Sequence, residues 1–173
     1  MRNLLFIVSF SFSVSGQPTI LVVGNHSSLC LIEINNFVSC DSLPDDISNF
    51  SVLMLFSGST SKLSQLDIER IVDFIDKGGG LYSGAENWPL QAESNQITSR
   101  LFKKESFGEY EQAIAQHGEL GGSLDLKKND TIPAGKTTVA FPLDYRLKVD
   151  AWVDDQPLIL SGNFGKGRII IDG

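Results

Sequence analysis

The clearest pattern of apolar and polar positions runs from residue 64 to residue 87. Apolar side chains recur there at the spacing of one helix face, at Ile68, Ile71, Val72 and Ile75. The positions between them are mostly charged, so the stretch predicts an amphipathic helix with one face on a core.

Both ends of this helix carry their own signals. Ser64 is the expected N-cap because its hydroxyl can accept from first-turn amides, and Asp67 lies at the positive end of the helix dipole. Lys77 suits the negative end, and Gly78 can take the left-handed conformation that ends a helix. Residues 81–82 then begin a buried strand.

Two earlier apolar runs predict buried strands, PTILVV at residues 18–23 and FSVLMLF at residues 50–56. Each run ends in a polar turn. The second run, the helix and the strand after it form a βαβ unit, whose two strands should be parallel and joined by a right-handed crossover. This order of elements predicts the α/β class.

The rest of the chain gives weaker signals. Residues 37–40 favour a short strand, residues 94–102 a short helix and residues 137–141 another strand. Residues 158–160 and 168–171 indicate a β-hairpin around a glycine-rich loop. The apolar stretch LCLIEI fits a helix or a strand, and both interpretations stay open.

The first 16 residues resemble a secretory signal peptide, with a basic start, an apolar run and small residues before residue 17. The apolar run is shorter than the roughly 20 residues that span a membrane. The alternative is a buried N-terminal strand. We expect residues 17–173 to form a single domain. That domain ends directly after a strand, which fits a sheet edge or a chain truncated at its C-terminus.

The chain is acidic, with a formal net charge of −7. Removing residues 1–16 takes away Arg2 and no acidic residue, so the mature domain is more acidic still. We therefore expect no nucleic-acid partner and no insertion into a membrane after signal removal.

Cysteine and histidine are scarce, with two of each. A tetrahedral zinc site usually takes four cysteine or histidine ligands, and the chain has few of either. The sequence therefore predicts no metal and no cofactor. In a secreted chain Cys30 and Cys40 are able to form a disulfide. Two buried free thiols are the alternative, and spacing does not separate the two interpretations.

Two segments resemble class I glutamine amidotransferase-like domains. The stretch IVDFIDKGGGLYSGAEN resembles their helix, triple glycine, strand and nucleophile elbow, and PLILSGNFGKGRIIIDG is similar to their late hairpin. The resemblance implies a doubly wound, mostly parallel, flavodoxin-like sheet with a late β-hairpin.

The residues that carry amidotransferase chemistry are missing. Catalytic members present a cysteine at the elbow, which here falls at or next to Ala85. Ser83 is the nearest nucleophile type but lacks the G-x-S-x-G frame, and the late His-x-Glu pair is absent. The resemblance therefore implies the non-catalytic branch, found in extracytoplasmic, transport-associated and intraflagellar-transport modules.

A ligand site in such a sheet would lie beyond the carboxyl ends of the strands, at the point where the strand order reverses. The loops expected there carry the candidate binding residues, His26, Ser57, Ser83, Glu86 and Asn87. The alternative is three ordinary turns whose polar side chains satisfy backbone groups.

These observations favour a secreted or periplasmic, non-enzymatic α/β module that binds a protein partner or a small polar ligand. An alternative is a carbohydrate-metabolism enzyme or sugar-binding protein of the sugar-utilisation-like branch. Glu86 and His26 would then be the acid/base candidates. A structural segment of a larger surface or motility assembly is a third possibility.

Overall fold

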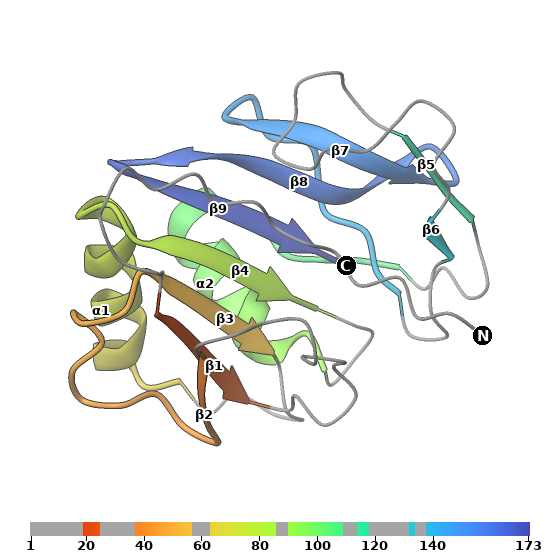
Figure 1. Ribbon diagram of the computed structural model, residues 1–173. Coiled ribbons are helices and arrows are strands. Elements are labelled where there is room, and N and C mark those ends of the chain that lie inside the picture. The colour runs from red at the N-terminus through yellow and green to blue at the C-terminus, as the bar shows by residue number, and fades with distance from the viewer. Residues whose placement is uncertain are drawn as a thin grey trace.

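The computed structural model describes residues 19–24, 37–56, 63–85, 90–108 and 138–173, and the backbone of residues 114–117 and 132–133. These residues form a nine-stranded sheet and two helices, which is an α/β fold (Figure 1). The predicted signal peptide and the ambiguous LCLIEI stretch lie outside the described residues.

One half of the sheet is parallel. Its strands, in spatial order β2-β1-β3-β4-β9, pair through four parallel ladders. They are β1 (Ile20–Gly24), β2 (Phe37–Cys40), β3 (Val52–Phe56), β4 (Gly80–Gly84) and β9 (Gly167–Asp172). The strands predicted around residues 18–23, 37–40 and 50–56 are therefore confirmed, and so is the parallel pairing across the βαβ unit.

The other half is antiparallel and continues from β9 in the order β8-β7-β5-β6. Its strands are β5 (Ile114–His117), β6 (Ile132–Pro133), β7 (Leu147–Val153) and β8 (Gln156–Phe164). β9 pairs with β4 on one side and β8 on the other, so the last described strand lies inside the sheet and not at its edge.

The late hairpin is confirmed, but its loop is shorter than predicted. Most of the predicted loop belongs to β8, where Ser161 pairs with Ile170 and Asn163 with Arg168. The connection is only Gly165-Lys166, with Gly165 at a φ of +57°. Polar and glycine residues in β8 are tolerated because the strand is paired on both sides.

Two predictions from the chain's second half need correction. The strand predicted at residues 137–141 is, over its described part, a single bridge between Ala140 and Phe107, and Phe141 N donates instead to Pro157 O. β7 was not predicted. Its signal was the alternation of buried Leu147 and Val149 around exposed Lys148.

Helices α1 (Gln65–Asp76) and α2 (Ala92–Phe102) cover the same face of the sheet (Figure 1). A row of in-register side chains from four parallel strands, Leu21, Leu53, Leu81 and Ile169, packs against both helices. The predicted face of α1 is confirmed for Ile68, Ile71 and Ile75, with Phe74 added and Val72 only half-buried.

Both ends of α1 form the predicted caps. Ser64 and Asp67 make a reciprocal capping box. At the other end Gly78 N donates to Ile75 O and Gly79 N to Phe74 O, both at 3.0 Å. This pair of bonds is a Schellman motif, and it turns the chain directly into β4.

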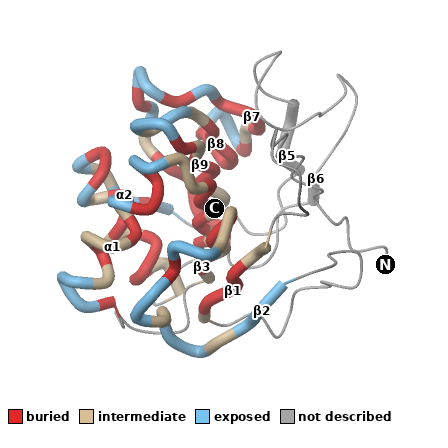
Figure 2. The backbone as a smooth tube through the Cα atoms, turned by 60° about the vertical axis from the view of Figure 1, so that its left-hand side comes forward, coloured by how far each residue is buried: buried red, intermediate tan, exposed pale blue. Residues whose placement is uncertain are grey.

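Figure 2 shows that burial is concentrated in the middle of the sheet and on the inner faces of the two helices. β2 forms one edge of the sheet, and Phe37 and Val38 on it are exposed. Among the described residues no helix has both the length and the apolar character needed to span a membrane.

Candidate functional site

Of the predicted binding residues, the structure describes Ser83. The other four, His26, Ser57, Glu86 and Asn87, lie outside the described residues. Their convergence on one pocket therefore stays a prediction, and the site is built here from the strand and helix ends that are described.

Ser83 lies on β4 with its side chain toward the helices, and it has no exposed surface. Its Oγ lies 2.8 Å from the Oγ of Ser94 on α2, so the two hydroxyls form a buried hydrogen bond. This bond joins the sheet to the helix layer. A ligand or a substrate would reach the Ser83 hydroxyl only if that contact opened.

The position expected for an amidotransferase nucleophile is Ala85, directly after β4. Ala85 is 6% exposed, and its N–H donates to Asp172 O at 2.7 Å. The residue therefore continues the pairing of β4 with β9. A methyl side chain at this place supplies neither a nucleophile nor a proton.

A small cavity of about 60 Å³ lies at the carboxyl ends of β1 and β3, beside the first turns of α1 and α2. Its polar lining includes Asp67 and Glu93. Pockets for small molecules usually measure about 300–1,000 Å³. The described part of the predicted site therefore has room for roughly two water molecules, and not for a sugar.

The opposite face of the sheet carries a second polar contact at the same end. The Tyr82 hydroxyl donates to the Asp172 carboxylate, and the Tyr82 ring lies 5.5 Å from the ring of Phe56. Burial, together with the Asp172 charge and this hydrogen bond, raises the pKa of Tyr82 well above its usual value. Tyr82 is thus held as a neutral donor.

A larger cavity, of about 470 Å³, lies at the other end of the parallel strands. One wall is the β2–β3 connection between residues 45 and 51, and the other is the C-terminal half of α1 with the glycines after it. Every lining residue is described. The sequence does not indicate this site, because Leu43-Pro44-Asp45-Asp46 has the composition of a turn with helix-start chemistry.

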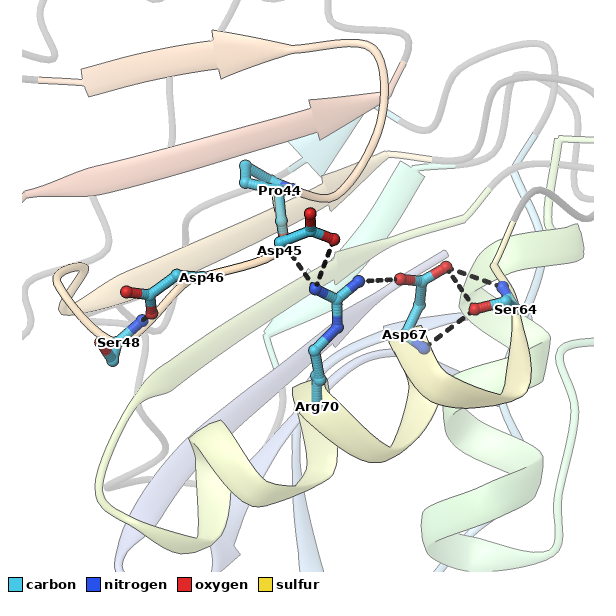
Figure 3. Close-up of polar contacts among 7 residues, drawn as sticks. All are labelled: Pro44, Asp45, Asp46, Ser48, Ser64, Asp67 and Arg70. Carbon is cyan, nitrogen blue, oxygen red and sulfur yellow. Dashed lines mark hydrogen bonds and ion pairs between the residues drawn. The ribbon is translucent and has the colours of Figure 1, made fainter.

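Arg70 ties the two walls together (Figure 3). Its Nη1 donates to Pro44 O at 3.0 Å and lies 3.4 Å from an Asp45 carboxylate oxygen, while Nη2 donates to Asp67 of the capping box. The guanidinium therefore fixes the connection against α1. The Arg70 side chain thus links the β2–β3 connection to α1 through one carbonyl and two carboxylates.

The rim of the cavity is acidic. Asp46 accepts from Ser48 N at 2.8 Å (Figure 3). Hydrogen bonding from the Ser48 side chain, and then from its backbone N–H, lowers the pKa of the Asp46 carboxyl. Asp73 pairs with Lys77 at 2.6 Å. Asp45 is fully exposed, so the rim presents three carboxylates to solvent or to a ligand.

The described residues contain no cluster of three or more histidine, cysteine or acidic side chains that would suit a metal ion. Cys40 is a free thiol whose Sγ lies 3.8 Å from Val22 O, and burial raises its pKa. Cys30 lies outside the described residues, but the free thiol of Cys40 favours the alternative of free thiols over the predicted Cys30–Cys40 disulfide.

The sequence matches no known protein family and no curated protein. Its fold is similar to solved structures. Cytoplasmic Protein STM3548 from Salmonella typhimurium aligns with a TM-score of 0.65 at 13% identity, over 89% of this chain and 86% of that chain. The mmIFT52 N-terminal domain aligns with a TM-score of 0.64 at 12% identity, over 90% and 85% of the two chains.

Larger enzymes contain a segment of similar fold. The β-galactosidase from Bacillus circulans sp. alkalophilus aligns with a TM-score of 0.59 at 13% identity, over 90% of this chain but only 28% of that chain. At such identities the likeness establishes the fold alone. The alignments also show that a similar fold makes up most of some chains and only a segment of others.

Proposed function

We propose that this chain is a non-catalytic, extracytoplasmic α/β module that binds a protein partner or a small polar ligand. The observation that carries the proposal concerns the residues at the carboxyl end of β4 and directly after it. Ala85 replaces a nucleophile there, and the nearby Ser83 hydroxyl is buried in a bond to Ser94. Acyl transfer needs an accessible nucleophile beside a base, and the described residues offer none at this place.

The finer fold proposal is a doubly wound, amidotransferase-like sheet. The parallel order β2-β1-β3-β4-β9 supports it, because flavodoxin-like sheets follow the order 2-1-3-4-5. The described helices cover one face. A right-handed connection from β1 to β2 would run over the opposite face, which a doubly wound fold requires.

The structural neighbours support a modular role. A similar fold makes up most of the Salmonella protein and of the mmIFT52 domain, and about a quarter of the β-galactosidase. The proposed non-catalytic branch includes intraflagellar-transport modules. A fold that recurs inside longer chains suits a part that binds or assembles.

Secretion or periplasmic export is proposed from the signal-like first 16 residues. The Salmonella neighbours are named cytoplasmic proteins, but at 13% identity their location does not transfer to this chain.

A second proposed function is a carbohydrate-metabolism enzyme or a sugar-binding protein, in which His26 and Glu86 act. The observation that favours it is the fold likeness to segments of β-galactosidases. The 60 Å³ cavity at the described strand ends is too small for a sugar by itself, so this proposal depends on the loops that carry His26 and Glu86, which lie outside the described residues.

The test is a turnover assay of the purified protein on glutamine, on esters and on glycosides. We expect no product above the buffer rate. Turnover that disappears in Ser83→Ala or Glu86→Gln would overturn the non-catalytic proposal. A rise in melting temperature with one sugar of a broad panel would favour the sugar-binding alternative by linkage.

A further inference from the structure

We propose that the cavity between α1 and residues 45–51, here called the α1 groove, binds a peptide segment in which lysine or arginine stands beside an apolar residue. The inference rests on the proposed binding function, and it assigns that function a surface and a class of partner. It places the site at the amino ends of the strands, away from the predicted loop cluster.

The size and the floor of the α1 groove suit a short peptide segment. Its volume of about 470 Å³ lies inside the usual range of ligand pockets, unlike the cavity at the carboxyl ends. Ile47, Phe50 and Phe74 form an apolar floor, in which Ile47 and Phe74 are almost fully buried and Phe50 is half-buried. An apolar side chain lying on this floor would remove surface from water chiefly at Phe50.

The rim determines the charge of the partner. Three carboxylates, on Asp45, Asp46 and Asp73, face two cations, on Arg70 and Lys77. Arg70 pairs with Asp67 and Asp45, and Lys77 pairs with Asp73, so two of the three rim carboxylates are themselves paired. The three carboxylates still outnumber the two cations, so the rim has a net negative charge and attracts a bound cation more than a bound anion.

The end of α1 adds to the same field. The groove includes Asp73, Phe74 and Lys77 from the last turn of the helix and its cap, where the helix dipole is negative. No basic residue lies within the last turn of α1 itself. An ammonium or guanidinium group placed here therefore meets carboxylates and a helix C-terminus together.

The experiment is a ¹H–¹⁵N NMR titration of the full chain with two tetrapeptides, acetyl-Leu-Lys-Leu-Lys-amide and acetyl-Leu-Glu-Leu-Glu-amide. We expect the lysine peptide to shift amide signals of residues 45–51 and 73–79. The glutamate peptide should leave them in place. Binding should weaken in about 1 M salt, where the Debye length falls to about 3 Å.

The test variant is the double substitution Asp46→Asn, Asp73→Asn. Asparagine keeps the size of each side chain, and its carbonyl can still accept from Ser48 N. Each lost carboxylate should weaken the lysine peptide roughly threefold. The charge-matched control is the double substitution Asp154→Asn, Asp155→Asn, at two exposed residues of the β7–β8 turn with φ of +46° and +61°, which asparagine tolerates.

Unchanged amide signals outside the groove verify that the double variant folds. The proposal is overturned if both peptides bind equally, if the shifts gather elsewhere, or if the control pair Asp154→Asn, Asp155→Asn weakens binding as much as the Asp46→Asn, Asp73→Asn variant. Equal binding of acetyl-Ser-Lys-Ser-Lys-amide would overturn the role of the apolar floor. If these tests fail and the turnover assay also shows no product, the α1 groove is not the binding site. The proposal that the protein is non-catalytic then still holds.

Discussion

The two ends of the parallel sheet are built differently. At the carboxyl ends, the Ser83 hydroxyl of β4 points toward the helices and forms a hydrogen bond with Ser94 of α2. The cavity described at this end has a volume of about 60 Å³. At the amino ends α1 stands away from the β2–β3 connection, and the cavity is about 470 Å³. Over the described residues, the end where chemistry was expected has the smaller cavity.

The topology explains the open end. β2 pairs with β1, and β3 lies on the far side of β1, so the connection after β2 must cross the sheet to reach β3. Residues 45–51 make this crossing on the same face as α1. A short loop carrying polar backbone groups does not pack against a helix as closely as a second helix does. The α1 groove is the space that remains.

The amino end depends on one close backbone approach, which gives the largest expected effect. A side chain at Gly167 would place its Cβ 2.2 Å from Gly79 O and 2.3 Å from Ile75 O. Both are backbone atoms that cannot turn aside. Gly167→Ala should therefore lower the free energy of unfolding by about 3 kcal/mol, measured by urea denaturation. The melting temperature should fall by roughly 6–12 °C.

The neighbouring Lys166→Ala is the control for Gly167→Ala. Lys166 is exposed, and the bond it makes to Asp76 O comes from its backbone N–H. Its substitution should change the free energy of unfolding by less than about 0.5 kcal/mol. If both variants lose similar stability, the close approach at Gly167 is not what holds β9 to the end of α1.

The α1–β4 unit was the most predictable part of the molecule, because its signals are local. The capping box at Ser64, the apolar face and the glycine stop all depend on neighbours within a turn or two. β7 was not predicted although apolar and polar side chains alternate over residues 147–151, and the structure buries Asp150 together with its apolar neighbours. The hairpin loop was predicted to begin several residues too early. Gly162 has a low strand propensity, but its pairing with Ile169 keeps it in β8.

The candidate sites show the same limit. The elbow position at Ala85 could be found by counting from the triple glycine, since both belong to one short segment. The α1 groove could not be found that way. It is lined by residues from 45–51 and from 70–79, and around Asp45 and Asp46 the composition is only that of a turn. Which connection crosses β1, and on which face, is a property of the whole sheet.

The carboxyl end can be tested through its buried hydroxyl pair. Ser83→Ala should lower the free energy of unfolding by about 1–2 kcal/mol, because Ser94 loses a buried hydrogen bond. The double variant with Ser94→Ala should cost less than the sum of the two single variants. Urea denaturation of the three variants measures the coupling.

Ser99→Ala is the matched control on α2, since its hydroxyl bonds to Glu105 at the surface. It should cost less than about 0.5 kcal/mol. A Ser83→Ala variant that is as stable as the parent protein would contradict the structural role of the pair and would return Ser83 to the list of ligand contacts.

The smallest expected effect concerns pH at the same end. Because the pKa of Tyr82 is raised in the folded state, its hydroxyl stays protonated when an unfolded tyrosine begins to ionise near pH 10. The folded state then binds more protons than the unfolded state, so stability is complete below about pH 10 and falls as the pH rises further. The slope for one proton is at most about 1.4 kcal/mol per pH unit.

Tyr82→Phe should remove this alkaline loss, although it also removes the bond to Asp172 and so lowers stability at neutral pH. The exposed Tyr145→Phe is the control and should leave the alkaline profile of the parent unchanged. Urea denaturation between about pH 8 and about pH 11.5 separates the two variants, because this range brackets the usual tyrosine pKa of about 10. If Tyr82→Phe keeps the parent slope, Tyr82 is open to water and its contact with Asp172 does not close its own face of the sheet. The contrast with the α1 groove would then rest on the helix-covered face alone, where Ser83 binds Ser94.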